Sequence, residues 1–390
     1  MLEAYFQPLD AGLLWHDGQA LPSDALGNAI QSYYQEGKFP DFEGVRIAII
    51  GVGEDRGNQL NIGAANGMDH IREKFYSLKV HQHPQRIIDL GNIRRGDTLE
   101  DTYAAIATVI YELIPLKIIP VILGGSQDLT YGHYAGYKKL EQIINIVSVD
   151  SHFDLGQPED PVNADTFLGK IILEQPNYLF NFSNIGYQTY YVGTESVELM
   201  KKLYFDTFRL GQVRDDIQET EPIVRNADLV TVDLSAIRQS DAPGNSQASP
   251  NGFFGEEACQ ILMYAGVSDK LSGLGIYEYN PKFDVNGQTA SLVAQMLWYF
   301  IEGVSSRKQD LPLLNANNYI TYIVAIANVA QEITFIKSTK SDRWWMKLPM
   351  EGGRNRYLSH HLLPCSYKDY QQACNNEVPD RLWNALQKLA

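Results

Sequence analysis

Short apolar runs recur along the chain between about residue 45 and residue 277. They cover residues 45–51, 86–91, 118–123, 144–149, 184–193, 204–210, 228–234 and 273–277. Runs of this length are typical of strands that are buried on both faces. Segments with helical spacing of apolar residues lie between or after them, near residues 65–78, 97–113, 129–142, 255–267 and 287–303. The alternation predicts a three-layer α/β/α sandwich around a mostly parallel sheet.

The two ends of the chain lack this alternation. Residues 1–43 are predicted to form an N-terminal arm with a short helix near residues 23–35. Residues 44–309 form the predicted α/β domain, and residues 310–390 form a C-terminal extension that packs on it. In the extension we expect helices at 315–330 and 380–389. The pair Trp344-Trp345 could anchor an interface between subunits or pack inside the chain, and the sequence leaves both open.

Composition and net charge limit the kinds of molecule that this protein is expected to bind. The chain has 390 residues, 44% of them hydrophobic and 20% charged, as in soluble globular proteins. Its net charge of -15 would repel nucleic acid and anionic membranes, so we expect a small-molecule substrate, and a homo-oligomer is compatible. We see no signal peptide and no apolar run long enough to span a membrane. Three cysteines without a C-x-x-C pair suit a reducing compartment, so we expect a cytoplasmic protein.

The run 144–149 ends in the motif Asp150-Ser-His152-Phe-Asp154. In an extended chain the side chains of residues 150, 152 and 154 point to the same face. Two carboxylates and an imidazole are ligands for a divalent ion, and ligands bind at the carboxyl ends of strands in open α/β sheets. The alternative interpretation is a solvated surface motif without a role.

Three more predicted strands end in polar groups. Asp233 and Ser235 follow one apolar run, Glu278 follows another, and Gln127 and Asp128 follow a third. Carboxylates at several neighbouring strand ends repel one another unless a cation joins them or water solvates them. The pattern therefore favours a metal site at this edge of the sheet.

A glycine-dense loop, residues 51–63, follows the first strand. Its spacing is G-x-G-x-x-x-G, and no acidic residue closes a second strand about 20 residues later. Dinucleotide binding is therefore a weak alternative for this loop.

Together these motifs resemble the ureohydrolase family, which comprises arginase, agmatinase and formimidoylglutamase. The resemblance runs from about Val45 to Glu302. Residues 124–128 (Gly-Gly-Ser-Gln-Asp) stand where the family has Gly-Gly-Asp-His-Ser, and residues 150–154 where it has Asp-Ala-His-x-Asp. Residues 233–235 stand where it has Asp-x-Asp, and residues 278–281 match its Glu-x-Asn-Pro. The order and spacing of four motifs imply an arginase-like fold.

The resemblance implies a hydrolase in which two manganese ions hold a bridging hydroxide that attacks a guanidinium or formimidoyl carbon. By resemblance, Asp150 and Asp233 would bridge the ions. Asp154 would complete the first ion site together with Gln127.

By the same resemblance, His152 would complete the second ion site together with Ser235. Glu278 would hold the cationic end of the substrate, and with Asp150 it is the residue that we assign to catalysis. We also place Asn163 among the residues that contact the substrate.

The chain departs from the family at both ion sites. Gln127 replaces a histidine ligand and Ser235 replaces an aspartate, and both are poorer ligands for manganese. The segment 163–169, where some members carry a proton-shuttling histidine, contains none. His133 could compensate, and Asp128 could serve as a replacement ligand.

Two functions follow. The first is metal-dependent hydrolysis of a C–N bond in a small amidine or guanidine compound, as in formimidoylglutamase, with one manganese ion or a weakly held pair. The second is a catalytically inactive binding or assembly protein on an arginase fold, with no ion. The two functions differ in the metal ligands that they require: hydrolysis needs a complete ligand set, and the binding protein does not.

Overall fold

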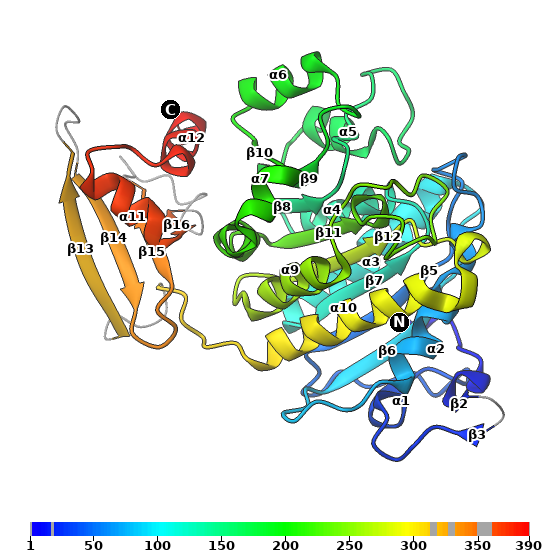
Figure 1. Cartoon of the computed structure of the whole chain (residues 1–390). Coiled ribbons are helices and arrows are strands. Elements are labelled where there is room, and N and C mark those ends of the chain that lie inside the picture. The colour runs from blue at the N-terminus through cyan, green and yellow to red at the C-terminus, as the bar shows by residue number, and fades with distance from the viewer. Residues whose placement is uncertain (1, 17–18, 313–317, 327–331, 349–360, 390) are drawn as a thin grey trace.

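The structure is a computed structural model that describes residues 2–16, 19–312, 318–326, 332–348 and 361–389. Its main feature is a ten-stranded sheet in the order β1-β6-β5-β7-β12-β11-β8-β9-β10, with β4 also paired to β6 (Figure 1). All neighbours in this sheet run parallel except β1 and β6. The strands are β1 (Phe6–Gln7), β4 (Gln31–Ser32), β5 (Ile47–Val52), β6 (Ile87–Ile93), β7 (Ile119–Gly124), β8 (Ile144–Val149), β9 (Leu179–Tyr187), β10 (Asp206–Arg209), β11 (Leu229–Asp233) and β12 (Gly273–Tyr277).

Helices cover both faces of this sheet. The core on one face includes side chains of α2 (Met68–Ser77), α7 (Leu210–Asp215), α8 (Thr220–Arg225), α9 (Gly255–Val267) and α10 (Gln288–Ser305). The core on the other face includes side chains of α3 (Leu99–Leu113), α4 (Leu129–Lys139), α5 (Phe167–Leu173) and α6 (Thr194–Lys202). The central strands β5, β7 and β8 are buried along their whole length because helices cover both sides. The predicted three-layer sandwich with a mostly parallel sheet is confirmed.

Two predicted elements near the sheet have different limits. The expected short helix near residues 23–35 is present but shorter: α1 covers only Leu26–Ala29, and the chain then pairs with β6 through β4. Before it in the chain, β2 (Trp15–His16) pairs antiparallel with β3 (Gln19–Ala20). β9 begins at residue 179, earlier than expected, because its polar residues Asn181 and Ser183 are buried and bond to Asp206 on the neighbouring strand.

The C-terminal extension contains a second, antiparallel sheet in the order β13-β14-β15-β16. Its strands are β13 (Tyr319–Ala325), β14 (Glu332–Ser338), β15 (Trp344–Lys347) and β16 (Leu362–Cys365), followed by α11 (Tyr367–Cys374) and α12 (Asp380–Leu389). The predicted helix at 315–330 is wrong over residues 319–325, where β-branched and aromatic residues favour a strand. Residues 315–317 and 327–330 of that prediction lie outside the described residues.

The extension is anchored to the α/β domain by Arg225, the last residue of α8. Its Nη2 donates to the carbonyl oxygens of Trp344 (3.1 Å) and Cys365 (3.2 Å). Its guanidinium group lies 4.4 Å from the centre of the Trp345 ring. Both tryptophans are buried in the chain's own packing, which is the second of the two alternatives for this pair. In the part of the chain that the structure describes, no helix has the length and apolar character that a membrane span requires.

Candidate functional site

The candidate site lies at the carboxyl ends of five adjacent strands, β5, β7, β12, β11 and β8. The register pairs Val232 with Val149 and Asp233 with Tyr277, so Asp150, Asp233 and Glu278 leave the sheet side by side. The strand order therefore brings together residues that are far apart in the sequence. This is the edge of a parallel sheet at which ligands bind in α/β folds.

Three aspartates, Asp150, Asp154 and Asp233, form a carboxylate cluster at this edge. Asp150 is buried, and the other two are partly exposed. Burial, and next the charge of Asp233, raises the pKa of Asp150 well above its usual range. Burial and the charge of Asp150 do the same to the pKa of Asp154, and burial raises the pKa of Asp233 to about 6. The cluster therefore requires a cation or protons to be stable.

The residues from Asp150 to Asp154 do not continue strand β8. β8 ends at Val149, and Asp150 Oδ1 accepts a 2.8 Å hydrogen bond from the backbone N–H of His152. Asp154 has a φ of 51°, a left-handed conformation. The prediction that residues 150, 152 and 154 lie on one face of an extended strand is therefore wrong, because the strand ends before them. A turn, and not strand alternation, places Asp154 beside Asp150.

The residues expected at the second ion site bond to Ser151. The Ser151 Oγ atom lies 2.9 Å from His152 Nδ1 and 3.2 Å from Ser235 Oγ. The His152 ring also stacks on Tyr191, with 4.9 Å between ring centres, and burial lowers its pKa. Ser235 lies in the short 3-10 helix after β11 (η6, Leu234–Ala236), and its N–H donates to Asp233 Oδ1. Serine at 235 thus completes a hydroxyl–imidazole chain instead of presenting a carboxylate.

Gln127 is buried in the turn that follows β7. Its Nε2 donates to Thr231 Oγ1 at 3.2 Å. Its Oε1 is buried without a hydrogen-bond partner, as is Oδ2 of Asp150. Such buried acceptors are costly unless a donor or an ion satisfies them.

Glu278 is held by the chain itself. Its Oε2 accepts from Asn58 Nδ2 (3.0 Å) and Asn61 Nδ2 (2.7 Å), and its Oε1 accepts from the backbone N–H of Gln127 (2.7 Å). Burial, and next the charge of Asp233, raises the pKa of Glu278 to about 8. Sequence reasoning missed the two asparagines. Their position in the glycine-dense loop could have marked them as candidates. The sequence could not show that they bond to Glu278, which lies some 220 residues away.

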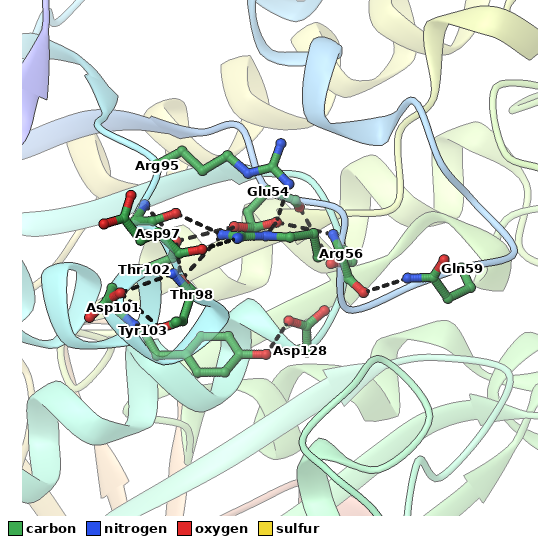
Figure 2. A network of polar contacts seen from close by, with 12 residues as sticks. Glu54, Arg56, Gln59, Arg95, Asp97, Thr98, Asp101, Thr102, Tyr103 and Asp128 are labelled. Atoms are coloured by element: carbon green, nitrogen blue, oxygen red, sulfur yellow. Dashed lines mark hydrogen bonds and ion pairs between the residues drawn. The ribbon is translucent and has the colours of Figure 1, made fainter.

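A polar network fixes the base of the glycine-dense loop (Figure 2). The buried Glu54 carboxylate accepts from Arg56 Nε at 2.9 Å and from Thr102 Oγ1 at 3.1 Å. Burial raises the pKa of Glu54, but hydrogen bonds from Arg56 and the charge of Arg95 lower it below the usual value overall. Arg56 also donates to the carbonyl oxygens of residues 96–98, before α3. The network thereby positions the loop that carries Asn58 and Asn61.

Asp128 belongs to this network. Its carboxyl group accepts from the Tyr103 hydroxyl group, as Figure 2 shows, and burial raises its pKa to about 6.

Asn163 uses its Oδ1 within its own loop, where it accepts from the N–H of Asp165 at 2.9 Å. Asp165 is exposed, but its charge adds to that of the carboxylate cluster. A substrate contact by Asn163 and a ligand role for Asp128 stay predictions.

His133 lies in the core and does not face the cluster. It is fully buried, its ring is stacked on Tyr137 at 5.9 Å, and neither ring nitrogen has a hydrogen-bond partner. A Cβ added at Gly273, the first residue of β12, would lie 2.6 Å from its Nε2, so the ring packs at the opposite end of that strand. The structure gives His133 a structural role, not that of a proton shuttle.

We expect His133 to make stability depend on pH. Burial lowers its pKa to about 3, so between pH 6.5 and 3 the unfolded chain binds the proton that the folded chain does not. Stability is therefore retained above pH 6.5 and lost as the pH falls. Between pH 7 and pH 5 the loss should be about 2 kcal/mol. Urea unfolding of His133→Phe should show this difference removed, and an unchanged pH profile would contradict the assignment.

Comparisons with known proteins identify the class of this protein. The model of the Arginase family matches residues 45–302. The chain therefore belongs to the arginase family.

Two individual relatives are formimidoylglutamases. The chain is 26% identical to a formimidoylglutamase of Streptococcus gordonii over 283 residues, which cover 67% of this chain and 85% of the relative. It is 28% identical to a formimidoylglutamase of Lysinibacillus sphaericus, over 64% of this chain and 82% of the relative.

Solved structures support the fold. The Bacillus subtilis formimidoylglutamase superposes with a TM-score of 0.67 at 19% identity, over 76% of this chain and 97% of that chain. A Trypanosoma cruzi formiminoglutamase with Mn2+ superposes with a TM-score of 0.63 at 20% identity, over 68% of this chain and 96% of that chain. These two structures leave 24–32% of this chain without a superposed counterpart. The match to the family model ends at residue 302, before β13 begins.

The donor set fits one manganese ion better than two. Among the described residues, no three His, Cys, Asp or Glu side chains are already arranged around a common ion position. The carboxylate cluster nevertheless has excess negative charge and, with Gln127, two buried unpartnered oxygens, which suit a hard divalent ion. The second half of the family's ligand set fits poorly, because position 235 offers a hydroxyl group in place of a carboxylate, and that hydroxyl group bonds to Ser151.

Proposed function

We propose that this protein hydrolyses a C–N bond of a small amidine or guanidine compound, in the manner of formimidoylglutamase, with one manganese ion. The observation that carries the proposal is the carboxylate cluster with its unpartnered oxygens, Asp150 Oδ2 and Gln127 Oε1. The formimidoylglutamase relatives support the substrate class. Three free cysteines, Cys259, Cys365 and Cys374, support a cytoplasmic location.

In this proposal Asp150, Asp154 and Asp233 hold the ion together with the Gln127 amide oxygen. The ion would supply a water molecule of lowered pKa and polarise the amidine carbon. The chain's own residues bind and orient the substrate. A carboxylate has about four acceptor positions, and three of those of Glu278 are taken by donors of the chain. The remaining position can accept one N–H of the substrate's cationic end, and Asn163 contacts its polar part.

The alternative is an inactive binding protein on the same fold. It is favoured by the internal bonds of Glu278 and Ser235, which use the groups that would meet substrate and a second ion. Protons in place of an ion would then relieve the repulsion within the carboxylate cluster.

The two functions are separated by an assay with the full chain. Purified protein loaded with manganese is incubated with formimidoylglutamate, agmatine and arginine, and released formamide or urea is measured. We expect slow hydrolysis of formimidoylglutamate that requires manganese and disappears in Asp150→Asn. Asp160→Asn serves as the matched control, because Asp160 accepts a bond only from its own loop. Turnover of none of the three compounds would favour the inactive protein.

A further inference from the structure

β13 is an unprotected edge of the C-terminal sheet. Over its seven residues, Tyr319–Ala325, it carries no charged side chain, and among the described residues it pairs only with β14. Ile320 and Ile323 are 46% and 63% exposed. The backbone N–H and C=O groups on its outer side are therefore available to another strand.

The other sheet edges of this protein are protected. At the opposite edge of the same sheet, the Cys365 carbonyl oxygen of β16 accepts from Arg225. The edge strands of the main sheet are only two and four residues long, and the longer one, β10, carries Asp206 and Arg209. Short strands and charges are the usual means of preventing edge pairing. β13 has neither, so its open edge is the exception among the described strands.

We propose that β13 pairs with β13 of a second copy of this chain, antiparallel and across a two-fold axis at Tyr322. A two-fold interface requires a self-complementary surface. In this register Ile320 lies opposite Val324 of the partner copy, Thr321 lies opposite Ile323, and no charges meet. Two chains of net charge -15 can approach most easily through a charge-free strand. The two four-stranded sheets would become one continuous sheet of eight strands.

The position of β13 allows this pairing. Figure 1 shows β13 at the outer side of the extension, away from the α/β domain, and the strand order places β14, β15 and β16 between them. A second α/β domain would therefore lie at the far end of the joined sheet and would not collide with the first. The edge pairing leaves both candidate sites accessible, so the dimer is independent of the proposed hydrolysis.

Light scattering on the full chain during gel filtration tests the dimer. We expect twice the chain mass of 43.9 kDa for the native protein and the single mass for Ile320→Lys/Ile323→Lys, with unchanged circular dichroism. Val285→Lys, at a more exposed apolar residue of the α/β domain (72%), should stay dimeric. A native monomer across a wide range of concentration would overturn the proposal, as would a dimer that the double lysine variant leaves intact.

Cross-linking tests the register. In a Cys374→Ser background, which removes the exposed cysteine, Tyr322→Cys should form a disulfide between two copies under mild oxidation. Ala325→Cys should not, because the two residues 325 would lie about 20 Å apart. Cross-linking of Ala325→Cys but not of Tyr322→Cys would overturn the two-fold axis at Tyr322. A monomer that binds an added β-strand peptide instead would assign the edge to a different partner.

Discussion

The double variant Gln127→His/Ser235→Asp is expected to bind a second manganese ion and to hydrolyse formimidoylglutamate about 100-fold faster than the native chain. Changes around a ligand already alter metal affinity or activity by about 10–100-fold, and these substitutions restore ligands themselves. Imidazole at 127 would replace an amide that bonds to Thr231. A carboxylate at 235 would replace the hydroxyl that bonds to Ser151. Elemental analysis and initial rates measure both effects.

The matched control is Gln127→Leu/Ser235→Ala, which changes the same positions to side chains that cannot bind a metal. It should gain neither an ion nor activity. Thermal unfolding shows whether each variant is folded. An unchanged metal content and rate in a folded His/Asp variant would show that these two positions do not limit the site.

Asp89→Asn is expected to lower the free energy of unfolding by about 3–5 kcal/mol, because it leaves the buried Arg72 guanidinium without its charge partner. Arg72 on α2 and Asp89 on β6 are both fully buried. Asp89 accepts from Arg72 Nε (2.8 Å) and Nη2 (3.0 Å), and also from the Tyr76 hydroxyl group and the N–H of Gly91. Among the described residues, the other acidic side chain that contacts Arg72 is Asp69, which is half exposed. Urea unfolding measures the loss.

Asp69→Asn is the matched control for this pair. Asp69 also contacts Arg72, at 3.0 Å from Nη1, but its side chain is 49% exposed. Exposed ion pairs contribute at most about 1 kcal/mol, so the control should lose less than that. Equal losses in the two variants would contradict the view that burial decides the effect.

The sheet could be predicted from the sequence because its strands are short apolar runs that a parallel sheet buries on both faces. The same reasoning located the polar residues at the strand ends, including Asp150, Asp233 and Glu278. Their meeting depends on the strand order β5-β7-β12-β11-β8, which hydrophobic patterns alone do not contain. The resemblance to the ureohydrolases supplied the order of the motifs, and the family match confirms that resemblance.

The partners of the candidate site residues could not be predicted. Glu278 bonds to Asn58 and Asn61 because the loop after β5 folds over the end of β12, a contact between distant segments. Ser151 looked like a spacer in the motif, yet its hydroxyl group bonds to both His152 and Ser235. The helix predicted over residues 319–325 was also wrong, because the β-branched and aromatic residues there form a strand that pairs with β14.

The most direct test of the central claim is the metal content of the full-length protein after incubation with manganese and removal of unbound ions. The account predicts one ion per chain, and its loss in Asp150→Asn, because the carboxylate cluster and Gln127 supply the ligands of one ion only. No bound ion in excess manganese would contradict the account and make the carboxylate cluster a proton-sharing site. Two ions per native chain would contradict it as well, since Ser235 would then have to leave Ser151 and act as a ligand.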